Sequence, residues 1–71
     1  MKAKGMPDRR IIIRMQDIGM TYTKLAERLR LKGYDIATVD VFDIARKLRK
    51  VPRTMQDDIA DILGCTRKDI F

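Results

Sequence analysis

The 71-residue sequence has no histidine, only one cysteine, and a longest aliphatic run, Ile11-Ile12-Ile13, of just three residues. Without histidine, the chain lacks the side chain that proteins use most often as a general base and metal ligand. The lone Cys65 excludes a disulfide within the chain, which fits a reducing cytoplasm. A membrane span needs roughly 20 apolar residues, and no apolar stretch follows the first lysines to make a signal peptide. We therefore expect no enzyme activity, no cofactor, no small-molecule substrate and no membrane partner.

The positions of the glycines and of the acidic residues also give no indication of a site for a small ligand. The four glycines are scattered along the chain, so no glycine-rich phosphate loop is present. Asp57, Asp58 and Asp61 form the densest acidic group, but they fall early in an expected helix, where they complement the positive end of its dipole. We expect no metal site.

Basic residues are abundant. Sixteen lysines and arginines face ten acidic residues, which gives a net charge of +6 and a pI near 9.9. Such a balance in a small domain is typical of a protein that binds a polyanion, although a charged, soluble surface alone gives the same balance. A hydrophobic content of 45% is enough for one core. We predict a flexible basic leader over residues 1–7 and a single domain over 8–71.

Apolar residues recur at spacings of three and four, which indicates helices. No segment alternates as a strand does, so we predict an all-α fold: a compact bundle of four short helices plus a final turn. The segment before the third helix is rich in β-branched residues, so that helix starts either at once from Asp35 or, as we prefer, after Thr38 as N-cap. The expected helices are 9–18 (capped by Asp8, ended by Gly19), 22–31 (capped by Thr21), 39–49 (ended before Pro52) and one capped by Thr54 and ended by Gly64.

The expected core consists of the stripes on these helices. In the third helix the stripe is Val41, Ile44, Ala45 and Leu48. After Gly64, Thr66 and Asp69 repeat the spacing of a capping box and open the last turn. We expect that turn to fold back and bury Ile70 and Phe71; the alternative is a chain whose next residues are missing.

The charge is segregated along the chain. Residues 21–53 hold nine basic and four acidic residues, a net +5, whereas residues 54–64 carry −3. Two helices of this length joined by a short turn with a glycine suggest a helix-turn-helix, in which the second helix enters the DNA major groove. The alternative is a solvated, self-complementary helix, because acids at 40 and 43 and bases at 46–50 suit the helix dipole, and Asp43 and Lys47 form an i, i+4 pair.

Three segments, "GMTYTKLAERL" (19–29), "FDIARKL" (42–48) and "PRTMQDDIADILGCTRKDIF" (52–71), resemble the Ner-like phage regulators within the lambda-repressor-like helix-turn-helix class. The resemblance implies a small all-helical protein of the bacterial cytoplasm or nucleoid that binds DNA and regulates transcription. It implies that Arg46 and Lys47 face the groove from the recognition helix and that Thr21 and Tyr22 lie near a phosphate. The sequence departs from the family in a longer turn, 32–39, and in the start of the recognition helix.

The resulting hypothesis is a sequence-specific regulator of double-stranded DNA, a repressor of phage or mobile-element type that acts as a homodimer. Residues off the helical stripes, Ile13, Ile36, Val39 and Phe42, are the expected dimer contacts. Two alternatives stay open: a protein-interaction module such as an antitoxin or antirepressor, and a DNA-bending accessory protein of recombination. The predicted DNA-binding residues are Thr21, Tyr22, Lys24, Arg28, Lys32, Thr38, Asp43, Arg46, Lys47, Arg49, Lys50 and Arg53.

Overall fold

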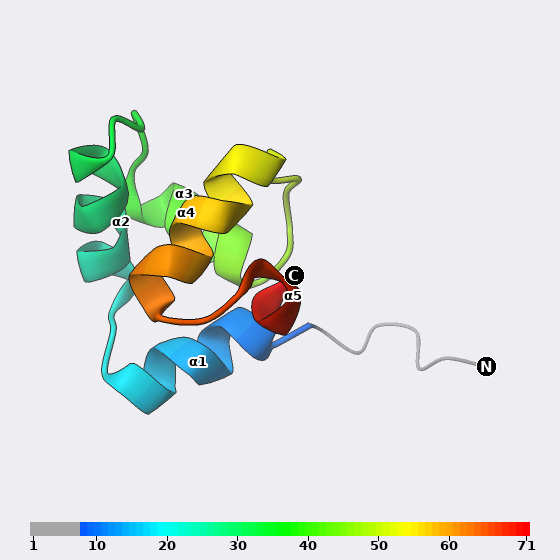
Figure 1. The fold of residues 1–71 in the computed structure, drawn as a ribbon. Coiled ribbons are helices and arrows are strands. Elements are labelled where there is room, and N and C mark those ends of the chain that lie inside the picture. Colours follow the sequence, from blue (N-terminus) through cyan, green and yellow to red (C-terminus); the bar gives the residue numbers. More distant parts are fainter. Residues whose placement is uncertain (1–7) are drawn as a thin grey trace.

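A computed structural model describes residues 8–71, which fold into five helices with no strand in that range. The flexible leader predicted for residues 1–7 lies outside the described part. In Figure 1 α2 stands beside α3 and α4, α1 runs beneath them, and the short α5 lies next to the start of α1. The helices are α1 (Arg10–Ile18), α2 (Tyr22–Leu31), α3 (Thr38–Ala45), α4 (Arg53–Leu63) and α5 (Arg67–Ile70).

The first two helices confirm their predicted bounds within one residue. Thr21 caps α2, because its hydroxyl oxygen accepts a hydrogen bond from the Lys24 amide at 3.1 Å. Asp8 does not occupy the N-cap of α1, which is Arg9. Asp8 is the residue before this N-cap, and its carboxylate accepts a hydrogen bond from the Arg10 amide at 3.1 Å. Asp8 therefore still satisfies one backbone donor of the first turn of α1.

The third helix is shorter than predicted and begins one residue earlier. Its N-cap is Ala37, not Thr38, and the Asp40 carboxylate accepts a hydrogen bond from the Ala37 amide at 3.0 Å. The helix ends at Ala45 because Lys47 adopts a left-handed backbone with φ of 61°. The amides of Lys47 and Leu48 donate back to the carbonyls of residues 44 and 43, a Schellman motif.

The fourth helix also starts earlier than predicted. Pro52, with an extended ψ of 148°, is the N-cap, and Thr54 lies inside the first turn. The first helical bond runs from the Gln56 amide to the Pro52 carbonyl at 2.9 Å. Gly64, with φ of 72°, ends α4 as expected, since a left-handed residue here suits glycine.

The core contains side chains from all five helices, and α5 closes it against α1 and α4. Ile70 is 1% exposed, so its expected burial is confirmed, whereas Phe71 is only half-buried and packs against the buried cluster. Two residues of the predicted core stripes are exposed: Leu48, at 66%, because the helix ends before it, and Ile18, at 40%, in the last turn of α1. Ile36, which was expected to lie off the stripes, is buried. The fully buried large side chains are Ile11, Leu25, Leu29, Val41, Ile59, Leu63 and Ile70.

Candidate nucleic-acid interface

The α2–α3 pair is held together at both ends. Residues 32–37 connect the two helices, and the Arg30 guanidinium donates a hydrogen bond to the Ile36 carbonyl at 2.8 Å. Near the start of α2, the Tyr22 ring meets the Phe42 ring edge to face, with centroids 5.3 Å apart. These contacts fix the outer surface of α3 beside the first turn of α2.

The outer surface of α3 is more apolar than expected for a groove-reading helix. Val39 is 63% exposed and Phe42 38% exposed. Thr38 and Asp43 are both half-buried. Arg46, the first residue after the helix, lies with its guanidinium carbon 5.1 Å from the centre of the Phe42 ring, a cation–π contact.

Five of the predicted DNA-binding residues lie in the segment that follows α3. Because α3 ends at Ala45, they fall in residues 46–53, a segment we call the basic loop, with α4 beginning at its last residue. The basic loop contains no acidic residue, so no residue of the loop itself balances its positive charge. Its members are Arg46, Lys47, Arg49, Lys50 and Arg53.

Some predicted cations are free and others are paired. Lys24 and Arg28 on α2, and Lys50 and Arg53 in the basic loop, are exposed and form no ion pair within residues 8–71. Lys32, by contrast, lies 3.4 Å from an Asp61 carboxylate oxygen.

Lys32 also lies 3.9 Å from Asp58, whose carboxylate accepts a hydrogen bond from the Tyr34 hydroxyl. That hydrogen bond raises the pKa of Tyr34. Arg49 donates to Asp40 at 2.9 Å. The Ala37 amide, together with this arginine, holds the pKa of the Asp40 carboxyl below its usual value.

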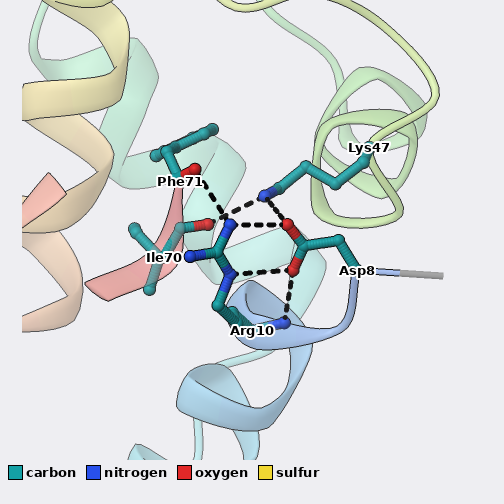
Figure 2. A network of polar contacts seen from close by, with 5 residues as sticks. All are labelled: Asp8, Arg10, Lys47, Ile70 and Phe71. Atoms are coloured by element: carbon teal, nitrogen blue, oxygen red, sulfur yellow. Dashed lines mark hydrogen bonds and ion pairs between the residues drawn. The ribbon is translucent and has the colours of Figure 1, made fainter. Parts of the chain in front are cut away.

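Lys47 does not face outward as predicted. Its ammonium lies 2.7 Å from an Asp8 carboxylate oxygen and donates to the Ile70 carbonyl at 2.8 Å, while the Phe71 ring centre lies 4.8 Å away (Figure 2). The predicted pair with Asp43 is therefore wrong. Lys47 joins the segment before α1 to the end of α5, and these contacts support its left-handed backbone.

Arg10 completes this network. Its guanidinium donates to both Asp8 oxygens, at 3.1 and 2.8 Å, and to the Phe71 carbonyl at 2.9 Å (Figure 2). The hydrogen bonds from Arg10, assisted by Lys47, hold the pKa of the Asp8 carboxyl well below its usual range, although partial burial acts in the opposite direction. The network therefore stabilises the fold while Asp8 is ionised.

We predict that Asp8→Asn lowers the melting temperature at pH 7, since charge-assisted hydrogen bonds worth about 1 kcal/mol shift it by roughly 4–8 °C. A carboxyl group whose pKa is lowered by folding contributes its full stabilisation of the folded state at pH values above its pKa in the unfolded chain. The difference between variant and wild type should therefore be complete above about pH 5 and shrink as the pH falls below about 4. Thermal melts from pH 7 to pH 3 measure it. Asp17→Asn, at an exposed position, is the control; equal effects of both substitutions would contradict the role given to Asp8.

A groove beside the basic loop contains two polar residues that sequence reasoning missed. It has a volume of about 430 Å³, and Arg67 of α5 and Gln56 of α4 line it together with Lys47, Arg49, Lys50 and Phe71. Arg67 lies 14 residues beyond the basic loop in sequence, so no local pattern predicts that the two meet.

Other kinds of site find no support in the described part of the chain. Residues 8–71 contain no cluster of three or more side chains suited to hold a metal ion. Burial raises the pKa of the Cys65 thiol, which disfavours the reactive thiolate. None of the described helices has the length and apolar character needed to cross a bilayer.

No protein-family model, curated protein sequence or solved structure matches this chain.

Proposed function

We propose that this protein is a sequence-specific, double-stranded-DNA-binding transcriptional regulator of the repressor type. The observation that carries the proposal is the placement of its free cations: Lys24 and Arg28 on α2, and Lys50 and Arg53 in the basic loop, lie on the two segments adjoining α3. In a helix-turn-helix, the second helix lies in the major groove while its neighbour crosses the backbone, so cations on both sides would meet phosphates. The resemblance to Ner-like regulators, which depends on three sequence segments alone, agrees with this assignment.

Within this proposal α3 is the recognition helix and Arg46 its base-reading residue. Arg46 is exposed and has no acidic partner among residues 8–71, and an arginine can donate two hydrogen bonds to a guanine edge. The start of α2, Thr21 and Tyr22, lies beside α3 through the Tyr22–Phe42 contact and would approach a phosphate. Lys47 is no longer proposed to face the DNA major groove, because Asp8 and the Ile70 carbonyl already bind its ammonium.

The proposed functional form is a homodimer on DNA. The eight residues of α3 rise about 12 Å, which spans only three or four base pairs and gives one copy little specificity. Ile13, Val39 and Phe42 remain candidate dimer contacts because each is exposed, whereas Ile36 is buried and is withdrawn.

Selection of bound duplexes from a random pool tests the proposal. We expect an enriched near-palindrome with half-site centres about 10–10.5 base pairs apart or a multiple of that. A promoter fused to the selected site should then be repressed in cells, which separates a regulator from a DNA-bending accessory protein. Failure to enrich any sequence would reject sequence-specific binding, and an asymmetric site that takes one protein would reject the dimer.

Arg46→Ala is predicted to weaken binding to the selected site by about 1–3 kcal/mol and to relax the preference at one base position. Lys24→Ala should instead weaken binding to every sequence by a similar factor, since phosphate contacts carry no sequence information. Competition binding against a panel of single-base variants measures both effects. If Arg46→Ala leaves the preference intact while affinity drops uniformly, Arg46 contacts a phosphate instead of a base.

A second candidate function follows from the apolar surface of α3. Exposed Val39 and Phe42 are side chains that protein interfaces bury more readily than a DNA groove does. α3 would then bind a partner protein, as in an antitoxin or antirepressor. Lys24→Gln combined with Arg53→Gln separates the two functions, because DNA binding loses two of its proposed phosphate contacts while a partner protein keeps the apolar surface of α3.

A further inference from the structure

The groove between the basic loop, α4 and α5 combines positive charges from separate segments. Lys47, Arg49 and Lys50 come from the loop and Arg67 from the first position of α5. Among residues 8–71, no acidic side chain lines it. Lys47, Arg49 and Arg67 each pair with an acid that lies outside the groove, and Lys50 has no ion-pair partner within residues 8–71. A bound anion would therefore meet positive charge in the groove itself.

Acids outside the groove hold both arginines in place. The Arg49 Nη1 donates to Asp40 at 2.9 Å, and the Arg67 Nε donates to Asp57 at 3.1 Å. Within residues 8–71 these are the only side-chain hydrogen bonds of the two guanidinium groups, so both terminal nitrogens of Arg67 are free to donate. Such tethering lowers the entropy lost when a ligand binds.

We propose that this groove is a phosphate-binding site. Two parallel N–H donors on a guanidinium match two phosphate oxygens, and Lys50, which has no ion-pair partner in the described chain, supplies a mobile third donor. A volume of about 430 Å³ exceeds a single phosphate and lies within the roughly 300–1,000 Å³ typical of sites for organic ligands. The groove therefore has room for a phosphate carried on a larger molecule.

The phosphate can come from the DNA backbone or from a free phosphorylated small molecule. The first source rests on the proposed function: Arg53 and Lys50 would hold the duplex on the basic loop, and the groove would take a backbone phosphate next to them. The second source would make the groove a site for an effector. The two sources share the same protein donors and are separated by experiment.

Arg67→Gln tests the groove with Lys68→Gln as its matched control, because Lys68 is the next residue, is exposed, carries the same charge and does not line the groove. In fluorescence anisotropy with a duplex near 0.1 M salt, losing one phosphate contact should weaken binding roughly tenfold and make the salt slope about 0.9 less negative. Lys68→Gln should change affinity less than threefold. The same variants are titrated with a 5′-mononucleotide and followed by NMR shifts of Arg67, or of Gln56 where Arg67 is replaced.

The outcomes are distinct. Weaker duplex binding by Arg67→Gln than by Lys68→Gln supports the groove with DNA as its ligand. Saturable mononucleotide binding that Arg67→Gln abolishes, with DNA affinity unchanged, supports the groove with a free ligand. If Arg67→Gln and Lys68→Gln behave alike toward both probes, the groove proposal is overturned while the proposed function stands. If the wild type binds no duplex, the proposed function fails and the mononucleotide titration alone decides for or against the groove. Should Arg67→Gln fail to fold, Lys50→Gln with the mononucleotide decides in its place.

Discussion

Ile70→Ala should leave this protein largely unfolded at temperatures where the wild type is folded. Ile70 is 1% exposed and lies in the core that α5 closes over α1 and α4. Truncating a buried isoleucine costs about 2–5 kcal/mol, because the transfer free energy of the lost atoms is joined by the cost of a cavity. A single core in a domain of this size rarely supplies more than roughly 3–5 kcal/mol. The substitution therefore removes most of the available stability.

Ile13→Ala is the matched control, since it makes the same chemical change at a side chain that is 52% exposed. It should alter stability by less than about 0.5 kcal/mol. Thermal and urea melts followed by circular dichroism measure both variants, and Ile70→Ala should lower the melting temperature by at least about 10 °C. Similar melting temperatures for the two variants would show that the last turn contributes little to the core.

The apolar spacing was enough to predict where the helices lie but not where each one ends. Four helices, α1 to α4, end at their C-termini in a Schellman motif. In three of them the residue with the left-handed backbone is a glycine: Gly19, Gly33 or Gly64. Those three ends are visible in the sequence because glycine takes this conformation without strain. At the fourth end the residue is Lys47, which no local rule selects, so the predicted helix ran on to residue 49.

The explanation for Lys47 lies far away in the sequence. A non-glycine residue in the left-handed region costs about 1–2 kcal/mol, and here Asp8 and the Ile70 carbonyl bind the lysine ammonium once the chain has folded. Partners 39 and 23 residues away cannot be deduced from spacing within one helix. The same limit applies to the groove, because Arg67 reaches the basic loop only through the packing of α5.

The candidate interface was therefore predictable in composition but not in geometry. The net charge of residues 21–53 indicates a polyanion partner from the sequence alone. Which cations are available depends on tertiary neighbours: Lys24 has no ion-pair partner in the described part of the chain, whereas Lys32 meets Asp58 and Asp61 of α4. Both lysines belong to the same basic segment, and nothing local distinguishes them.

The number of available cations sets the expected salt dependence of DNA binding. Each phosphate neutralised by a lysine or arginine releases counterions, so log K falls with log salt by about 0.9 per contact. Each bound copy offers four cations that the proposal assigns to phosphates and that are unpaired within residues 8–71, namely Lys24, Arg28, Lys50 and Arg53. Together with groove contacts they give an expected slope of roughly −4 to −7 per copy. Raising the salt from about 50 to about 200 mM should then weaken binding by roughly 250-fold to 16,000-fold.

Lys24→Gln and Lys32→Gln form the internal comparison, because they remove the same charge from the same helix or its immediate end. Lys24→Gln should make the slope about 0.9 less negative. Lys32→Gln should change the slope less, since its ammonium lies 3.4 Å from Asp61 and would have to leave that carboxylate to reach a phosphate. Affinity measured at five or more salt concentrations gives both slopes. A wild-type slope near zero would reject phosphate-dominated binding, and equal slopes for the two variants would show that the Lys32–Asp61 pair opens freely on DNA.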